Sequence, residues 1–282
     1  VMSRVDVRKT HKLFIGGSFP RSESGRTYEV TDSKDQFLAN MALASRKDAR
    51  DAVLAARSAV AKWSAATAYN RGQVLYRIAE VMEGRREQFI SEVSDSEGVS
   101  SRKAGAHVDA AIDRWVWYAG WADKYAQVIG NTNPVAGPFF NFSVPEPTGV
   151  VAAVAPQDAS VLGLVSVVAP IIVTGNAVII MPSSSRPIPA ITLAECLATS
   201  DVPAGVVNIL TGAPAEVMPW LAEHADVNAL DLTGIVDEGV AADLERSAAG
   251  TVKRVRGAAP HADWQATPSL SRIRAFVEVK TV

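Results

Sequence analysis

Two glycines between residues 233 and 239 form the turn of this sequence that is best suited to hold a phosphate group. The stretch reads T-G-I-V-D-E-G, with Gly234 and Gly239 at a predicted strand-to-helix turn. Glycine lets the backbone come close to a ligand, and the N–H groups at a helix N-terminus attract phosphate. Asp237 and Glu238 would repel a phosphate at close range, or they are ordinary first-turn acids that stabilise the helix dipole. Both interpretations stay open on the sequence alone.

The turn after the first predicted strand of the sheet lacks the usual nucleotide-binding glycines. In nucleotide-binding folds this place normally carries G-x-G-x-x-G, whose glycines let the backbone approach a pyrophosphate. Residues 155–160 read A-P-Q-D-A-S instead. The pattern here therefore supports a fold and, by itself, no ligand.

The single cysteine, Cys196, is predicted to be a buried structural residue. It lies in the middle of a predicted helix over residues 188–199, flanked by Glu195 and Leu197. A catalytic thiolate needs a basic neighbour that lowers its pKa, and none is near in sequence. One cysteine also excludes an intramolecular disulfide and a cysteine-based zinc site, which fits a reducing compartment such as the cytoplasm.

The histidines do not form a recognisable site. His11, His107, His224 and His261 are scattered without metal-ligand spacing, and no Ser-His-Asp arrangement is indicated. An isolated carboxylate such as Asp158 is more often a cap or a surface group. The residues alone therefore predict neither a metal site nor a catalytic constellation.

From Gly149 onward, short β-branched runs alternate with helical segments. The predicted strands cover residues 150–154, 177–180, 206–210, 228–232 and 252–255, and the predicted helices cover residues 161–173, 188–199, 215–223 and 238–248. Strands that are apolar on both faces and alternate with helices indicate a parallel sheet covered on both sides. The sequence predicts an α/β, Rossmann-like, doubly wound parallel sheet of about five strands.

The first half of the chain predicts elements that pack on the outside of this sheet. Residues 12–43 suit a short meander of strands, and helices are expected over residues 47–63, 70–92 and 101–125. An aromatic run at the end of the third helix is either a stacking surface or core packing, and helical spacing favours the core. The run consists of Trp115, Trp117, Tyr118 and Trp121.

A proline- and glycine-rich stretch before the sheet predicts a projecting hairpin. It covers residues 131–147 and carries Phe139, Phe140 and Phe142, and exposed aromatic residues on a hairpin suggest a protein interface. Residues 275–282 fit a terminal strand after a polar, irregular tail. We expect this strand to pair outside the main sheet, with the hairpin as its candidate partner.

Composition and charge exclude several classes of partner. The 282 residues are 48% hydrophobic and 21% charged with a net charge of −2, so no footprint for nucleic acid or an anionic membrane is visible. The apolar stretch 161–173 is shorter than the ~20 residues that span a bilayer, and Pro170 interrupts it. Residues 1–10 are charged and do not resemble a signal peptide.

Several motifs together resemble the aldehyde dehydrogenase superfamily over nearly the whole chain. They are L-F-I-G-G at residues 13–17, Y-N-R-G at 69–72, Y-A-G-W-A at 118–122, E-P-T-G-V-V at 146–151, G-N-A-V at 175–178, P-A-G-V-V-N-I-L-T-G at 203–212 and V-E-V-K-T-V at 277–282. The resemblance implies a Rossmann-type NAD(P)-binding domain and an oxidoreductase acting on aldehydes. It also implies an oligomerisation sheet made of a hairpin and the C-terminal strand.

The chain departs from the family where the family does its chemistry. The family's P-W-N-(F/Y)-P supplies an Asn to the developing oxyanion, whereas Asp158 stands in that place and its carboxylate would oppose the charge. The family's K-P-(S/A)-E holds the adenosine ribose, whereas residues 181–184 read M-P-S-S. The general-base Glu of E-L-G-G-K-S-P has no counterpart in residues 255–260, and no Cys lies among the 22 residues after Pro260.

The resemblance leaves a degenerate NAD(P) site whose positions match cofactor-binding positions of the family. These positions are Pro156, Met181, Ser183, Ser184, Gly212, Gly234 and Gly239. The replacement of the ribose-binding Lys and Glu weakens the expectation that NAD(P) binds. No catalytic residue is assigned.

The departures predict a pseudoenzyme similar to the noncatalytic second module of the two-module family 16 aldehyde dehydrogenases. Residues 1–130 and 149–260 would form the Rossmann-like domain, residues 131–148 and 270–282 the oligomerisation sheet, and the catalytic domain would be absent. The expected partner is a full-length aldehyde dehydrogenase subunit, because an unpaired sheet edge calls for one, and a self-dimer is the simpler alternative. The second hypothesis is an NAD(P)-binding oxidoreductase subunit that senses cofactor status.

Overall fold

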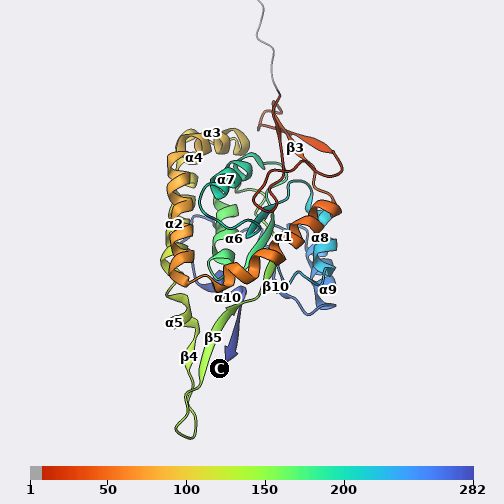
Figure 1. Cartoon of the computed structure of the whole chain (residues 1–282). Helices are drawn as coiled ribbons and strands as arrows, with labels where there is room; N and C mark the ends of the chain where they lie inside the picture. Colours follow the sequence, from red (N-terminus) through yellow and green to blue (C-terminus); the bar gives the residue numbers. More distant parts are fainter. Residues whose placement is uncertain (1–7) are drawn as a thin grey trace, which may run out of the picture.

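A five-stranded parallel β-sheet forms the centre of the molecule (Figure 1). The computed structural model describes residues 8–282. The charged start of the chain, in which the sequence shows no signal peptide, covers residues 1–10 and lies mostly outside the described residues. Across the sheet the strands are β10 (Arg254–Arg256), β9 (Ala229–Asp231), β6 (Val150–Val154), β7 (Ala177–Met181) and β8 (Val207–Ile209), each parallel to its neighbours. The predicted Rossmann-like sheet of about five strands is confirmed.

The side chains of the central strand β6 alternate between two hydrophobic cores. Val151 and Ala153 join one core, and Val150, Ala152 and Val154 join the other. Because successive strand residues point to opposite faces, both faces need a cover of helices. Helices α6 (Leu162–Ile172) and α7 (Ile188–Ala198) cover the first face, and α1 (Arg46–Ala65), α8 (Pro214–Glu223) and α9 (Glu238–Ala249) cover the second.

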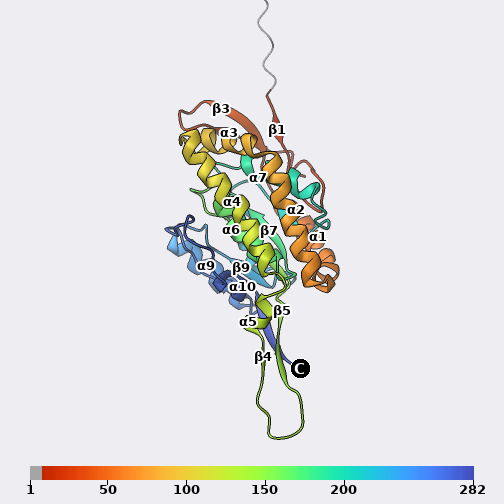
Figure 2. The same ribbon diagram turned by 90° about the vertical axis from the view of Figure 1, so that its left-hand side faces the viewer.

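The most apolar stretch of the chain is a buried helix, as its length predicted. Every residue of α6 is buried, including Pro170, and α4 packs over it (Figure 2). Within residues 8–282 no helix combines the length and the hydropathy that a bilayer crossing requires.

The helices of the first half differ from the prediction in two places. After α1, the helices of this half are α2 (Ala68–Gly84), α3 (Arg86–Glu97), α4 (Ser101–Trp121) and α5 (Tyr125–Ile129). The single helix expected over residues 70–92 is wrong, because the backbone leaves the helical region at Arg85, with φ −114° and ψ 14°. The bend lets α3 pack on α7, where the Arg85 guanidinium donates to Glu195 at 2.5 Å. The helix expected over residues 101–125 ends at Trp121, and α5 is separate.

The aromatic run at the end of α4 contributes to the core. Trp115 and Tyr118 are fully buried, which confirms the core interpretation for these two residues. Trp117 and Trp121 are partly buried against the same core, with their ring centroids 5.6 Å apart.

The N-terminal strands form a small three-stranded sheet, with one difference from a simple meander. Its strands are β1 (Thr10–His11), β2 (Thr27–Thr31) and β3 (Phe37–Ala42). Strands β2 and β3 pair as an antiparallel hairpin, whereas β1 pairs with β3 in parallel. A parallel pair needs a longer connection, which the loop over residues 12–26 and β2 supply.

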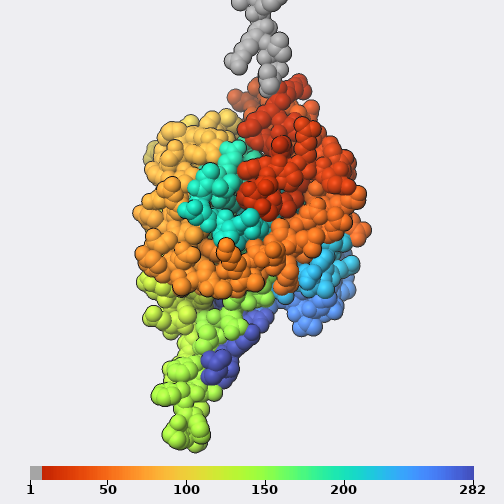
Figure 3. Space-filling model, in the orientation of Figure 1, coloured from red at the N-terminus to blue at the C-terminus, as the bar shows by residue number. Residues whose placement is uncertain are grey.

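A second small sheet projects from one end of the molecule (Figures 1 and 3). It consists of β4 (Asn131–Thr132), β5 (Phe142–Pro147) and β11 (Val277–Thr281), with β5 in the middle and both pairs antiparallel. The expected pairing of the terminal strand with the hairpin is therefore confirmed. The three phenylalanines of the hairpin are exposed, with Phe140 reaching 86%.

The segment between β10 and β11, residues 257–276, is called the strap below. It starts at the carboxyl edge of the sheet beside Thr233, packs against α6, and ends at the amino edge, where the Phe276 carbonyl accepts from Thr148 and Asn176. It contains the short helix α10 (Ser271–Ala275), where the sequence predicted only irregular chain up to residue 275. Arg272 of α10 donates to the carboxylate of Asp231 at 3.2 Å, and its guanidinium lies over the ring of Trp264. Arg114 of α4 donates to the carbonyls of Trp264 and Ala266. The strap is thus fixed to the sheet by a buried ion pair and to α4 by hydrogen bonds.

Replacing Arg272 by Met is expected to lower the free energy of unfolding by about 3 kcal/mol, because the fully buried Asp231 carboxylate loses its cation. The double variant Asp231→Asn, Arg272→Met is expected to lose less, since no buried charge remains. Urea denaturation measures both. Arg274→Met, on the exposed side of the same helix, is the control and is expected to change stability by less than about 0.5 kcal/mol. Equal losses in the Arg272 and Arg274 variants would contradict the anchoring role.

Candidate functional site

The turns that follow β6 and β7 are tied together by Gln157 at the carboxyl edge of the sheet. The Gln157 side chain donates to the carbonyl of Ala155 at 2.8 Å and accepts from the backbone N–H of Ser184 at 3.0 Å and its hydroxyl at 3.2 Å. The Ser183 hydroxyl donates to the Gln157 carbonyl at 2.9 Å. The two turns thus satisfy each other's hydrogen bonds.

A cavity of about 220 Å³ remains between the ends of β6 and β9. It is lined by Pro156, Gln157, Asp158, Thr233, Gly234, Val236, Pro260 and His261. Of the seven predicted cofactor positions, the structure brings Pro156 and Gly234 to this cavity. Two of its lining residues, Pro260 and His261, come from the strap.

The predicted positions on the turn after β7 are engaged in the fold. Met181 is fully buried in the core that also contains Ile179 and Leu210, so its side chain does not face the cavity edge. Ser183 is buried and Ser184 is half-buried, and both are bonded to Gln157. None of the three lines the cavity.

The remaining predicted glycines lie apart from the cavity. Gly212 has φ +129°, and a Cβ there would lie 2.8 Å from Leu43, so the glycine accommodates a close approach of the N-terminal segment. Gly239 is exposed in the first turn of α9. The Asp237 side chain caps this helix by accepting from the N–H of Val240 at 3.0 Å. The sequence left Asp237 open between a helix-stabilising acid and a charge that repels phosphate, and this hydrogen bond shows that it caps the helix.

Gly234 is required by packing within the chain. Its N–H donates to the carbonyl of Val154 at 2.9 Å, and a Cβ would lie 1.9 Å from the carbonyl oxygen of Ala155. The open space that glycine usually leaves for a phosphate is therefore occupied by the end of β6.

The donor set at this edge does not fit a dinucleotide. The exposed charged side chains here are the carboxylates of Asp158, Asp237 and Glu238, and the half-buried Arg186 donates to the Asp158 carbonyl at 2.8 Å. Carboxylates repel a pyrophosphate, and the N–H groups of Ser184 and Gly234 already donate to acceptors within the chain. No catalytic step through NAD(P) is derived from these residues.

Cys196 has the environment of a structural thiol. It is fully buried on α7, and burial raises the pKa of its thiol to about 11, although Arg85 partly opposes the shift. The Arg85 guanidinium lies 4.0 Å from the sulfur, a contact that the sequence did not reveal because it joins two helices.

The four histidines stay apart in the fold. His11 lies buried in β1, and burial lowers its pKa to about 4, with Lys9 adding to the shift. The His107 ring contacts the Glu97 carboxylate at 3.0 Å, and Glu97 accepts from the hydroxyl of Ser160. Over residues 8–282 no group of three or more histidine, cysteine or acidic side chains is placed to hold a metal ion.

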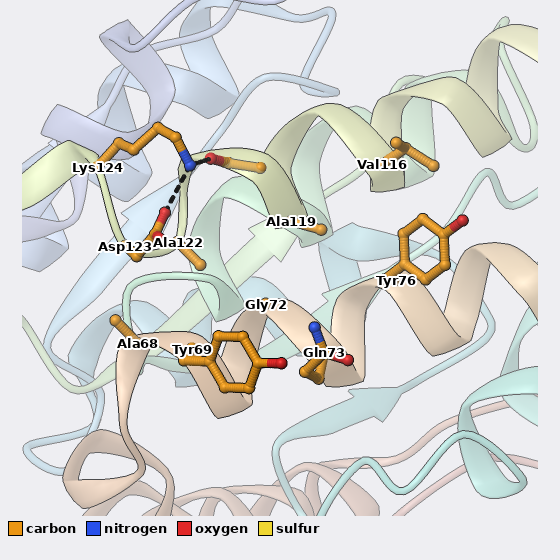
Figure 4. A pocket seen from close by; sticks show the side chains of 11 residues that line it. Ala68, Tyr69, Gly72, Gln73, Tyr76, Val116, Ala119, Ala122, Asp123 and Lys124 are labelled. Carbon is orange, nitrogen blue, oxygen red and sulfur yellow. Dashed lines mark hydrogen bonds and ion pairs between the residues drawn. The ribbon is translucent and has the colours of Figure 1, made fainter.

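A groove between α2 and α4 is a feature that the sequence did not predict (Figure 4). Its volume is about 280 Å³, and Tyr69 and Tyr76 of α2 line it opposite Val116 of α4. Its one ion pair, Lys124 with Asp123 at 2.7 Å, lies at its end. The tyrosines are seven residues apart, which is also the spacing of core residues on a helix, so the sequence pattern cannot distinguish a groove from core packing. The groove offers a mainly apolar surface with Gln73, Asp123 and Lys124 as its polar side chains besides the tyrosine hydroxyls.

Comparison with known proteins gives one consistent family. The model of the aldehyde dehydrogenase family matches residues 19–257. Cytosolic 10-formyltetrahydrofolate dehydrogenase of Pongo abelii is 33% identical over 241 residues, which are 83% of this chain and 26% of that protein. Cytosolic aldehyde dehydrogenase 1 of Elephantulus edwardii is 30% identical over 261 residues, 90% of this chain and 51% of that protein.

A solved structure agrees with these relatives. The NAD⁺ complex of aldehyde dehydrogenase from Bacillus cereus superposes with a TM-score of 0.82 at 26% identity, covering 88% of this chain and 50% of that one. The chain thus spans about a quarter to a half of the length of the proteins it matches.

Replacing Gly234 by Ala is expected to lower the free energy of unfolding by about 2–3 kcal/mol, because the new methyl group collides with the Ala155 carbonyl. Gly239→Ala is the matched control, since that methyl group meets only Asp237 at 3.1 Å and alanine favours a helix. Thermal or urea unfolding compares the two. A Gly234 variant as stable as its control would disprove the packing role.

Cys196 is expected to resist thiol reagents in the native chain. With a pKa of about 11, roughly one thiol in a thousand is ionised at pH 8, and the sulfur is also inaccessible. Labelling with a chromogenic disulfide should therefore be slow until guanidinium unfolds the chain. An added surface thiol, Ser185→Cys at an exposed position, is the positive control. Rapid labelling of native Cys196 would contradict the structural role.

Proposed function

Because this chain belongs to the aldehyde dehydrogenase family, we propose that it is a noncatalytic subunit that associates with a full-length aldehyde dehydrogenase. Its role is structural or regulatory, and the small sheet β4-β5-β11 makes the contact. The cytoplasm is the proposed compartment, in keeping with the single free cysteine and the cytosolic relatives.

The strap carries this proposal. The family match ends at residue 257, and the next twenty residues lead directly to β11, which joins the small sheet. The strap starts at the carboxyl edge beside Thr233, and Arg272 fixes its later part to Asp231 of β9. This short and closely packed route supports the proposal that no second lobe lies between β10 and β11.

The carboxyl edge of the sheet gives independent support. Asp158 offers a carboxylate where the resemblance implies an amide donor to an oxyanion, and like charges repel. Met181 is buried where the resemblance implies a cofactor-binding Lys. Gln157 bonds the neighbouring turns to each other. These features favour a fold that no longer turns over an aldehyde.

The small sheet supplies the surface for a partner. One face of it carries Phe142, Val144 and Val282 beside the charged Glu146, Glu278 and Lys280. Phe140 stacks on Phe142 with 6.1 Å between the ring centroids. The four apolar side chains are all more than a third exposed. A cluster of exposed apolar side chains on a projecting sheet is typical of an interface. The partner sheet of a related subunit fits this surface, and a second copy of the chain is the alternative occupant.

A cofactor-sensing subunit is the second candidate. The cavity lined by Pro156 and Gly234 favours it, whereas the exposed Asp158 and Asp237 oppose it. Calorimetric titration with NAD⁺ and NADP⁺ separates the candidates, because the sensor requires saturable binding and the noncatalytic subunit does not.

Recovery of a tagged chain from its native source is the experiment that tests the main proposal. The expected result is a defined complex that contains a full-length aldehyde dehydrogenase, identified by mass spectrometry. The variant Phe142→Asp, Val144→Asp is expected to lose the partner, because charges are placed on the apolar face. Val252→Asp, an exposed site far along the chain, is the control that keeps it. Recovery of the chain without any aldehyde dehydrogenase would refute the proposal.

A further inference from the structure

A polar cavity lies at the N-terminal sheet and shares no lining residue with the cavity between β6 and β9. Its volume is about 380 Å³, and it is called the N-terminal cavity below. Thr10 and His11 of β1 line it with Ala42 at the end of β3, and residues of the loop that leads from β1 to β2 complete the lining. Small-molecule sites commonly have volumes of about 300–1,000 Å³. The N-terminal cavity is therefore large enough for a small molecule.

The turn that borders the N-terminal cavity is held in place by buried hydrogen bonds to α1. The Ser22 hydroxyl donates to one Asp48 carboxylate oxygen at 2.8 Å, and the N–H of Glu23 donates to the other at 2.9 Å. Ser22 and Asp48 are both buried. Gly25 closes the turn with φ +68°, and its N–H donates to the Ser22 carbonyl at 2.9 Å. A ligand would therefore meet a wall that is already ordered, which lowers the entropy cost of binding.

The charges that line the N-terminal cavity are mainly positive. Lys12, Arg21 and Arg26 line it together with one carboxylate, that of Glu23. The Glu23 carboxylate is paired with Lys47 at 2.6 Å, and Arg26 is paired with a glutamate of α8 at 2.9 Å. No carboxylate within residues 8–282 forms an ion pair with Lys12 or Arg21. Two cations at the cavity thus lack a counter-charge in the described part of the chain.

The imidazole of His11 adds an uncharged hydrogen-bonding group. The residue is 7% exposed and lines the cavity, and its ring forms no hydrogen bond with any of the residues from 8 to 282. Burial lowers the pKa of His11 to about 4, with Lys9 adding to the shift and Glu195 opposing it. The ring is therefore neutral at pH 7 and has one N–H donor and one acceptor nitrogen. Because buried polar groups are normally hydrogen-bonded, a group inside the cavity is the expected partner.

We propose that the N-terminal cavity binds the phosphate group of a small molecule, with Arg21 and Lys12 as the counter-charges and His11 as a hydrogen-bond donor. The planar guanidinium of Arg21 suits two phosphate oxygens at once, and Lys12 acts as a point charge. Two uncompensated cations match the charge of about −1.5 to −2 that a phosphomonoester carries at pH 7, whereas a carboxylate supplies a single charge.

The size of the cavity bears on the rest of the ligand. A phosphate group alone is much smaller than about 380 Å³, so the remaining volume accommodates the organic part of a phosphomonoester. Free phosphate shares the same recognition chemistry. The two sources are separated by their relative affinities.

Two-dimensional ¹H–¹⁵N NMR of the purified chain, titrated with inorganic phosphate, ribose 5-phosphate or ribose, measures the binding and locates it. Saturable shifts at the Gly25 amide are expected with at least one phosphate compound at up to about 20 mM, and no shifts are expected with ribose. Tighter binding of ribose 5-phosphate identifies an organic phosphate as the ligand, and tighter binding of inorganic phosphate identifies the free anion. Both results support the site.

Three results of the same titration would overturn the proposal. The first is the absence of saturable shifts with either phosphate compound. The second is binding of ribose as tight as that of ribose 5-phosphate, because recognition would then not involve the phosphate group. The third is a set of shifts at Gly234 without any at Gly25, because the phosphate would then bind at the carboxyl edge of the main sheet.

Charge removal tests the two cations against a matched control. Arg21→Gln and Lys12→Gln are each expected to weaken binding of the tighter phosphate compound about tenfold, since each removes one charge-assisted contact. Lys34→Gln removes the same charge at the opposite end of the β2–β3 hairpin, and the expected change is less than about twofold. All three side chains are on exposed residues, so the fold tolerates the changes. Equal weakening in the Arg21 and Lys34 variants would indicate general electrostatic attraction and contradict the site.

The inference goes beyond the proposed function and does not depend on it. Arg21→Gln is expected to leave the recovery of a full-length aldehyde dehydrogenase unchanged. Phe142→Asp, Val144→Asp is expected to leave phosphate binding unchanged, because neither residue lines the N-terminal cavity. Failure of one proposal is therefore distinguishable from failure of the other.

Discussion

The carboxylate of Asp231 sits at the end of β9 without any exposed surface, and a charge in that position has to be neutralised by the fold. Arg272 neutralises it from α10, and the hydroxyl and N–H of Thr233 donate to the other oxygen. Burial lowers the pKa of Arg272, and the Asp231 charge opposes that shift. Because α10 is held here, β11 starts a few residues later beside β5. The small projecting sheet therefore depends on an ion pair inside the main domain.

The same constraint shapes the carboxyl edge of the sheet. In an open α/β sheet this edge is where ligands bind, since helix N-termini and strand ends leave free N–H groups there. Here the strap brings Pro260 and His261 over the edge, Gln157 joins two turns, and Gly234 packs on Ala155. The N–H of Ser184 and the side chain of Gln157, which could have contacted a ligand, hold the chain to itself. These bonds stabilise the edge beside the remaining cavity.

Much of the fold follows from patterns in the sequence, and the parts that do not have a common cause. The strand at residues 150–154 was predicted to the residue, because five consecutive apolar residues between turn signals indicate a strand buried on both faces. The break at Arg85 was missed, because helical periodicity continues through it and only the contact with Glu195 on another helix explains it. Propensity is local, whereas such contacts join residues that are far apart in sequence.

The candidate site shows the same division. The sequence identified the turns that meet at the carboxyl edge, and it left the role of Asp237 open between a cap and a charge that repels phosphate. The structure displays the cap. The sequence does not reveal that Gln157 joins two turns, because its amide can do so only when the fold brings Ser184 within hydrogen-bonding distance, here 3.0 Å. The cofactor positions as a set stay a prediction, with two of seven at the cavity.

The exposed face of the small sheet combines two kinds of group that act by different physical terms, and this difference bears on assembly. Phe142 and Val144 offer apolar surface, whose burial is non-directional and depends on the area covered. Glu146, Glu278 and Lys280 lie on the same face, and their charges favour one position of a partner over another. Apolar side chains alone would give affinity with little geometric control, and a few exposed charges alone would give geometry with little affinity. A face that presents both can define the orientation of the subunit that it binds, without any catalytic group being required.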